Sequence, residues 1–169
     1  MADVYFLLDM SSSMKDSMAL YKLLDFFSFH DKNMIVSIYF FNQHTDCIVD
    51  RCRNGLINID RVVDEYTPCG STSLYDAIDF VVTDAELHAK SKPKIIVYTD
   101  GVDTSSKYCV KSQIRDGINE LRKLGWTFIF MGATIEAYYS ARDIGIPRSH
   151  TIDARKMDCF QELYDYFKN

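Results

Sequence analysis

The hydrophobic pattern starts with an apolar run, Val4 to Leu8, in which apolar and polar residues do not alternate. Such a run is typical of a strand that is buried on both faces of a parallel sheet, although periodicity alone does not exclude a short buried helix. Asp9 ends the run, and serines follow it. The pattern therefore predicts a buried strand that carries a polar group to its carboxyl end.

Further along the chain, segments with helical periodicity alternate with short strand-like runs. A cluster of breaking residues at 67–73 must be a loop. The predicted helices are 15–29, 74–89, 110–124, 135–144 and 156–167, with a short helix or loop over 56–66. The predicted strands after the first are 34–41, 47–50, 95–99, 126–131 and 149–152.

This alternation predicts the fold class. Strands separated by helices of about ten to fifteen residues imply right-handed crossovers, and hence a Rossmann-like α/β fold: an open, mostly parallel sheet with helices on both faces. A turn at 42–44 between two strand-like runs adds one antiparallel edge strand. The 169 residues contain no repeat and no linker, so we expect a single domain, 1–169.

The residues after the first strand could form a metal loop. Ser11 and Ser13 are spaced by two, so in an extended loop both hydroxyls point the same way as the Asp9 carboxylate. Carboxylate and hydroxyl oxygens suit magnesium, calcium or manganese and suit zinc or copper poorly. The alternative is that Ser13, with Asp16 three residues later, only caps the following helix.

A second predicted strand, 95–99, also ends on an aspartate, Asp100, which Gly101 follows. In open α/β sheets, ligands bind outside the carboxyl ends of the strands, where the strand order reverses. Asp9 and Asp100 would lie side by side there only if their strands are neighbours. The sequence leaves that point open.

Charge and cysteine content narrow the class of protein. The formal net charge of −5 gives no reason to expect nucleic acid or an anionic membrane as a partner. No apolar stretch approaches the roughly 18 to 20 residues of a membrane span, and no leader-like segment precedes Val4. The five cysteines include no C-x-x-C pair, so we expect reduced, mostly buried thiols and a cytoplasmic setting.

The set of polar residues at the strand ends resembles the metal site of a von Willebrand factor A domain, and the resemblance covers nearly the whole chain. The family's first motif, D-x-S-x-S, is matched here, and so are its later threonine in GSTSLYDAI and its aspartate in VYTDG. In the family the fourth place of the first motif is usually glycine, whereas this chain has Ser12. The matching residues are Asp9, Ser11, Ser13, Thr72 and Asp100.

The resemblance implies a metal-ion-dependent adhesion site. The serines, with the threonine in one state, would bind the cation directly, and the aspartates would act largely through water. Mg²⁺ is the expected cofactor, with Mn²⁺ or Ca²⁺ possible, and a Glu or Asp of another protein would complete the metal shell. The SLYDAI and GWTFIFMGA segments suggest a closer likeness to small, stand-alone A-domain proteins of bacteria and their phages.

Other functions fit the sequence less well. The histidines are far apart and share no metal-ligand spacing, and no G-x-x-x-x-G-K-[ST] run occurs, so we expect no enzyme. A phosphatase of the haloacid dehalogenase type would need a second carboxylate where Ser11 stands. A flavodoxin-like protein could hold an FMN phosphate on the serines, but Asp9 and Asp100 would repel it. A metal-independent scaffold of the same fold is the other alternative.

Overall fold

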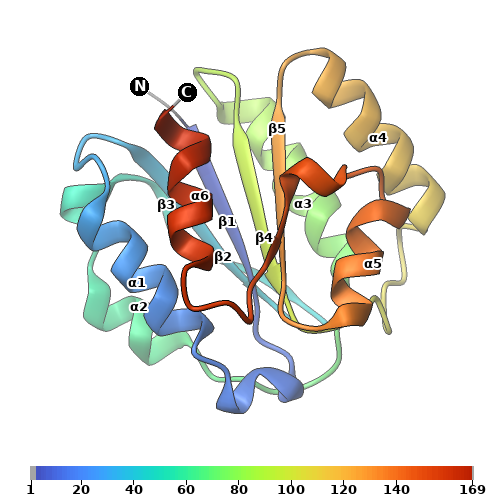
Figure 1. Ribbon diagram of the computed structural model, residues 1–169, viewed down its shortest axis with the longest axis horizontal. Coiled ribbons are helices and arrows are strands. Elements are labelled where there is room, and N and C mark those ends of the chain that lie inside the picture. The colour runs from blue at the N-terminus through green and yellow to red at the C-terminus, as the bar shows by residue number, and fades with distance from the viewer. Residues whose placement is uncertain (1–2, 169) are drawn as a thin grey trace.

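A computed structural model describes residues 3–168 of the chain, without the side chain of Lys168; residues 1–2 and 169 of the predicted domain lie outside the described part. The sheet has six strands in the order β3-β2-β1-β4-β5-β6 (Figure 1). The strands are β1 Asp3–Asp9, β2 Ile35–Phe41, β3 Thr45–Arg53, β4 Lys94–Thr99, β5 Thr127–Gly132 and β6 Thr151–Asp153. The helices are α1 Ala19–Phe29, α2 Ile59–Glu65, α3 Leu74–His88, α4 Lys111–Lys123, α5 Ile135–Asp143 and α6 Cys159–Lys168.

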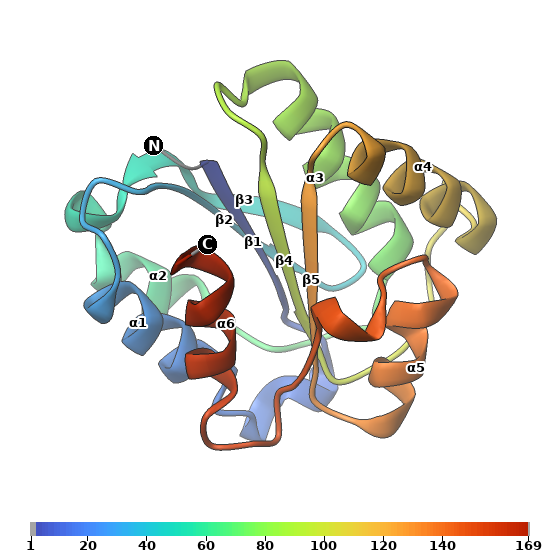
Figure 2. The ribbon, with the colours of Figure 1, turned by 45° about the horizontal axis from the view of Figure 1, so that its top comes forward.

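Helices cover both faces of the sheet, as the sequence predicts. Helices α1, α2 and α6 lie on one face, and α3, α4 and α5 lie on the other (Figures 1 and 2). Alternate residues of β1 enter the two cores: Phe6 and Leu8 pack on the first face, and Tyr5 and Leu7 on the second. This explains why the first apolar run does not alternate, because both of its sides are buried.

The strand order reverses beside β1. This strand pairs in parallel with β2 on one side and with β4 on the other, and Leu8 stands opposite Tyr98 in the second pair. The carboxyl ends of β1 and β4 therefore meet at the point where ligands bind in such sheets. Without the antiparallel edge strand β3, the five parallel strands follow the 2-1-3-4-5 order of flavodoxin-like proteins, so strand order does not decide against the FMN alternative.

Two predicted helices begin later than their periodicity suggested. In place of a helix from residue 15, a 3-10 helix covers Ser12–Asp16 and α1 begins at Ala19. The fully buried Met14 anchors this turn, and hydrogen bonds of the i to i+3 type, such as the one from the Met14 N–H to the Ser11 carbonyl, tighten it. Likewise α6 begins at Cys159 rather than 156.

The antiparallel edge strand is confirmed but is longer than predicted. Strand β3 runs over nine residues and pairs with β2 with an irregular register between Val36 and Tyr39. Its charged residues obscured the strand pattern in the sequence, because an edge strand exposes one side and its backbone edge to water. Arg51 has a φ of 43°, which breaks the regular extended conformation near the end of this strand.

The cysteines are free, as expected, but the prediction that most are buried is wrong. Only Cys159 is buried among them, Cys47 and Cys69 are exposed, and the remaining two are half-buried. Two of these thiols, Cys47 and Cys52, lie on the edge strand β3. Within residues 3–168, no helix has the length and hydrophobicity that crossing a membrane requires.

Candidate metal centre

Strand β1 places the Asp9 carboxylate at the centre of the site, fully buried. Its Oδ1 accepts a hydrogen bond of 2.7 Å from the Ser11 backbone N–H, and its Oδ2 accepts one of 2.5 Å from the Thr99 hydroxyl. Burial raises the pKa of Asp9, these hydrogen bonds lower it, and the negative charge of Asp100 raises it further. The carboxylate is thus fixed in place at an electrostatic cost.

The two serines connect Asp9 to Asp100. The Ser11 and Ser13 hydroxyl oxygens are 3.2 Å apart, and the Ser13 hydroxyl donates a hydrogen bond of 2.8 Å to Asp100 Oδ1. Ser11 is buried, whereas Ser13 is exposed. The group therefore extends from the core to the surface, and Ser13 lies at its outer end.

The helix-cap alternative for Ser13 is wrong. No side chain caps the 3-10 helix that contains it, and Ser13 lies inside that helix, bonded to Asp100 rather than to a backbone N–H. At the start of α1, the Ala19 N–H donates to the Ser17 hydroxyl, at 3.0 Å. The Ser13 side chain therefore belongs to the candidate metal site rather than to a helix cap.

Thr72 reaches the same place from the loop before α3. Its backbone carbonyl accepts hydrogen bonds from the N–H groups of Thr104 and Ser105, which fasten this loop to the segment after β4. A Cβ on Gly101 would lie 3.9 Å from Thr72 Oγ1, so the hydroxyl stands beside the backbone that follows Asp100. Within residues 3–168, no group forms a hydrogen bond with that hydroxyl oxygen.

Two further backbone contacts hold the first loop against the second. The Ser12 N–H donates to the Gly70 carbonyl at 3.0 Å, and the Cys69 N–H donates to the Met10 carbonyl at 2.9 Å. Gly70 has a φ of +77°, a conformation that glycine adopts without steric cost. At Ser12, which stands where the family usually has glycine, the backbone N–H makes the contact with Gly70 and the side chain is exposed.

The charges and donor atoms fit a hard divalent cation. Within residues 3–168, neither Asp9 nor Asp100 forms an ion pair with a Lys, Arg or His. The same residues include no group of three or more His, Cys, Asp or Glu side chains arranged to hold a metal ion. A cation here would therefore depend on the hydroxyls of Ser11, Ser13 and Thr72 as much as on the carboxylates, a set that suits Mg²⁺ or Mn²⁺.

Sequence reasoning missed three residues that support this site. Thr99 bonds to Asp9, the Tyr66 hydroxyl donates to the Asp9 carbonyl at 2.8 Å, and the Thr134 hydroxyl donates to the Asp100 carbonyl at 2.7 Å. The position of Thr99 directly before Asp100 was the one available indication. Tyr66 and Thr134 are distant in sequence, so only the fold brings them here.

Asp76 and Asp103 have structural roles next to the site. The Asp76 carboxylate accepts hydrogen bonds from the backbone N–H groups of three consecutive residues, 107 to 109. Asp103 accepts from the Tyr75 N–H at 3.2 Å and from the Ser106 hydroxyl. Together they fasten the loop after β4 to the first turn of α3.

The fold and the polar group at its strand ends define an α/β protein with its candidate site at the β1/β4 switch point. The chain belongs to the von Willebrand factor type A domain family, because the sequence model of that family matches residues 3–165. No curated protein matches the sequence. The family assignment therefore agrees with the resemblance that the motifs indicated.

Solved structures show the same fold at low sequence identity. Proximal thread matrix protein 1 from the mussel byssus is 16% identical, with a TM-score of 0.74, over 98% of this chain and 44% of that one. A structure of that protein with a zinc-occupied MIDAS motif gives 0.75 at 16% identity, over 98% and 45%. Manganese-loaded TRAP protein of Plasmodium vivax is 19% identical, with a TM-score of 0.69, over 94% and 71%. The chain thus spans less than half the length of the mussel protein.

Proposed function

We propose that this chain is a divalent-metal-dependent protein-binding module. Asp9, Ser11, Ser13, Thr72 and Asp100 would hold the cation, with Mg²⁺ as the expected ion. The observation that carries the proposal is the meeting of two carboxylates with serine and threonine hydroxyls at the switch point of the sheet, where neither carboxylate has an ion pair within residues 3–168.

The candidate site residues would have different roles according to how deeply each is buried. Asp9 is locked by Thr99 and the Ser11 N–H, so it would hold the first loop in place. Ser13 is exposed and Asp100 is half-buried, so they form the part of the site that a partner can reach. A bound cation would supply an electrophilic centre, and neutral hydroxyl ligands would leave that character largely intact. An Asp or Glu side chain of another protein is the group that such a centre would bind.

The solved structures support a divalent metal ion in this fold, but they do not identify the ion that this chain would bind. Zinc in the mussel protein and manganese in TRAP show that this fold carries divalent ions in those proteins. Mg²⁺ is preferred for this chain because all of the candidate side-chain donors are oxygens. The proposal includes a non-enzymatic role and a cytoplasmic setting; both rest on the sequence alone.

Calorimetric titration with Mg²⁺, Mn²⁺ and Ca²⁺, together with thermal melts with and without chelator, tests the metal site. We expect the wild type to bind the ion and to melt at a higher temperature with it, because a ligand that binds only the native state stabilises it. Ser13→Ala should weaken binding, since it removes an exposed donor without opening a buried cavity. Ser12→Ala is the matched control, because its exposed side chain has no role in the site.

Two results would reject the metal proposal. One is a wild type whose melting temperature does not respond to any of the three ions. The other is a Ser13→Ala variant that binds the ion as tightly as Ser12→Ala does. Asp9→Ala is informative only as a supplement, because removal of a buried, doubly hydrogen-bonded carboxylate also perturbs the fold.

A metal-independent scaffold is the second candidate. It is favoured by the direct hydrogen bond between Ser13 and Asp100, which lets the loops keep their arrangement without an ion. Partner capture repeated in chelator separates the two functions. A partner that stays bound in chelator indicates the scaffold, and a partner that is released indicates the metal-dependent module.

A further inference from the structure

A groove of about 790 Å³ begins beside the candidate metal centre and follows α3. Its near end includes Ser73, next to Thr72, and Gln43, whose side-chain oxygen accepts a hydrogen bond of 3.1 Å from the Ser71 N–H. Its far end reaches Leu87 in the last turn of α3. A segment lying in this groove would therefore extend directly from the metal loop.

The charge of the groove has one sign. Its lining includes four aspartates and no Lys or Arg, in a chain that has 19 Lys and Arg residues in total. Asp46 and Asp79 are exposed and form no ion pair within residues 3–168. Asp76 accepts hydrogen bonds from three backbone N–H groups. Of the four aspartates, only Asp84 pairs with a cationic residue within residues 3–168.

Apolar side chains lie between these charges. Phe80, Leu87 and Tyr108 line the groove and are 48%, 73% and 86% exposed, respectively. Phe80 and Leu87 are seven residues apart on α3, so they lie on the same face of the helix, two turns from each other. Large exposed apolar side chains gathered in a hollow are typical of an interaction surface.

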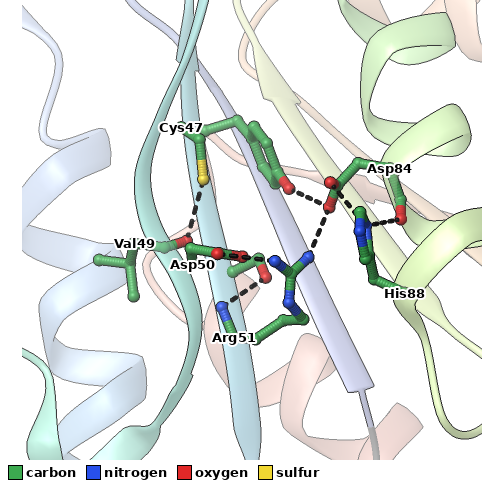
Figure 3. Close-up of polar contacts among 8 residues, drawn as sticks. Cys47, Val49, Asp50, Arg51, Asp84 and His88 are labelled. Atoms are coloured by element: carbon green, nitrogen blue, oxygen red, sulfur yellow. Dashed lines mark hydrogen bonds and ion pairs between the residues drawn. The ribbon is translucent and has the colours of Figure 1, made fainter.

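A polar network joins α3 to the strands beside the groove. Asp84 on α3 accepts a hydrogen bond of 2.6 Å from the Tyr39 hydroxyl and pairs with Arg51 of β3 at 3.3 Å (Figure 3). Arg51 also pairs with Asp50 at 2.7 Å, and His88 Nδ1 lies 3.1 Å from Asp84 Oδ1. These contacts join α3 to β2 and β3. The groove is thus formed before any partner arrives, which lowers the entropic cost of binding.

We propose that this groove binds a basic, apolar segment of a partner protein, containing Lys or Arg together with Leu, Phe or similar residues. Asp46 and Asp79 would pair with the cationic groups, and Phe80, Leu87 and Tyr108 would cover the apolar ones. The aspartates repel nucleic acid and anionic membranes, which excludes both as occupants. The proposal rests on the proposed function, because it assigns a second contact to the partner whose acidic residue would meet the metal.

The test uses a fluorescent peptide amide made of Arg, Lys, Leu and Phe, with no carboxylate, and the same peptide with Glu in place of its cations. Binding is measured by fluorescence anisotropy at low salt and in chelator, so that the carboxylates of the acidic peptide have no bound ion to meet. We expect the basic peptide to bind and the acidic one not to bind. Asp46→Asn/Asp79→Asn should weaken binding about fivefold, as expected for the loss of two exposed charge pairs. Leu87→Ser should also weaken it about fivefold, since its side chain would lose apolar contact.

The matched control is Asp64→Asn/Glu86→Gln, which removes the same charge from exposed residues outside the groove lining. It should bind the peptide as the wild type does. Equal weakening by the two double variants would overturn the proposal, because it would show attraction to net charge alone. Peptide-induced amide shifts in NMR spectra should concentrate at Asp79, Thr83 and Leu87; shifts confined to other surfaces would also overturn it.

Metal dependence distinguishes this proposal from the proposed function. The peptide has no carboxylate, so its binding should be the same in Mg²⁺ and in chelator. If the metal proposal fails, metal titration shows no response while the peptide still binds the groove. If the groove proposal fails, the metal response remains. The groove variants then bind the peptide as tightly as the wild type does, or the control variant loses as much affinity as they do.

Discussion

The Thr99 hydroxyl donates a 2.5 Å hydrogen bond to Oδ2 of Asp9, and both residues are fully buried. The same hydroxyl oxygen accepts a hydrogen bond of 3.1 Å from the Gly101 N–H. Thr99 therefore connects the end of β1 with the turn that follows β4. Both segments that carry the candidate aspartates are positioned by this one side chain.

Thr99→Val should lower the free energy of unfolding by about 1–3 kcal/mol, because it leaves a buried carboxylate oxygen and a backbone N–H without their partner. Thr99→Ser keeps the hydroxyl and should cost less. Urea denaturation of the three proteins measures the difference. If the valine variant is as stable as the serine variant, the hydrogen bond does not contribute as the geometry indicates.

The sequence predicted the elements of the fold well because their patterns are local. The unbroken apolar run at Val4 to Leu8 correctly indicated a strand buried on both faces, and the antiparallel hairpin followed from its turn residues. Where a tertiary contact decides, the pattern failed. The helix predicted from residue 15 begins only at Ala19, because the buried Met14 holds a 3-10 helix over Ser12–Asp16.

The candidate site was predictable as a set of residues but not as an arrangement. Asp9 and Asp100 each end a predicted strand, yet only the pairing of β1 with β4 brings them together, and strand adjacency is not a local property. The role of Thr99 was hidden for a related reason. A threonine in a strand is explained sufficiently by its β-propensity, and its position before Asp100 does not identify Asp9 as the partner of its hydroxyl.

Gly70→Ala should destabilise the protein by about 1 kcal/mol or more. Its φ of +77° strains any residue with a Cβ, and the added atom would meet the Gln43 side chain. The Gly70 carbonyl receives the Ser12 N–H, so the substitution should also loosen the first loop of the candidate metal centre. Thermal melts with and without Mg²⁺ measure both effects.

Gly117→Ala provides the opposite case. Gly117 is exposed inside α4, and a Cβ there would meet nothing within 4 Å. Alanine should stabilise the helix by about 0.5–1 kcal/mol. A destabilising Gly117→Ala, or a neutral Gly70→Ala, would contradict the local backbone description.

His30 should make stability depend on pH. Burial lowers the pKa of His30 from its ordinary value of 6.5, and a 2.7 Å contact between Nδ1 and the Phe26 carbonyl only partly offsets this. Below pH 6.5 the unfolded state therefore binds more protons than the native state. The free energy of unfolding should fall as the pH drops from that value through the lower pKa of the folded protein.

Urea denaturation between neutral and mildly acidic pH measures this dependence. His30→Phe cannot titrate and keeps a ring to stack on Phe26, so part of the acid-induced loss of stability should disappear in it. His44→Gln is the control, because His44 is exposed. A His30→Phe variant with the same pH profile as His44→Gln would show that His30 does not cause the effect.

Two stacked tyrosines should respond in opposite ways to loss of their hydroxyls. The Tyr5 hydroxyl is buried and lacks a hydrogen-bond partner within residues 3–168, and burial raises the pKa of Tyr5 to about 12. The Tyr39 hydroxyl donates to Asp84 at 2.6 Å. Tyr5→Phe should therefore leave stability unchanged or raise it, because it removes a polar group that folding desolvates without compensation. Tyr39→Phe should cost about 1–3 kcal/mol, since it deprives a half-buried carboxylate of a donor. Urea denaturation of the two variants gives the comparison, and their ring packing is matched because the two rings stack on each other at 6.4 Å.

Equal losses of stability in both variants would mean that ring packing, rather than hydrogen bonding, decides the effect. They would also mean that the Asp84 network does not hold α3 against β2.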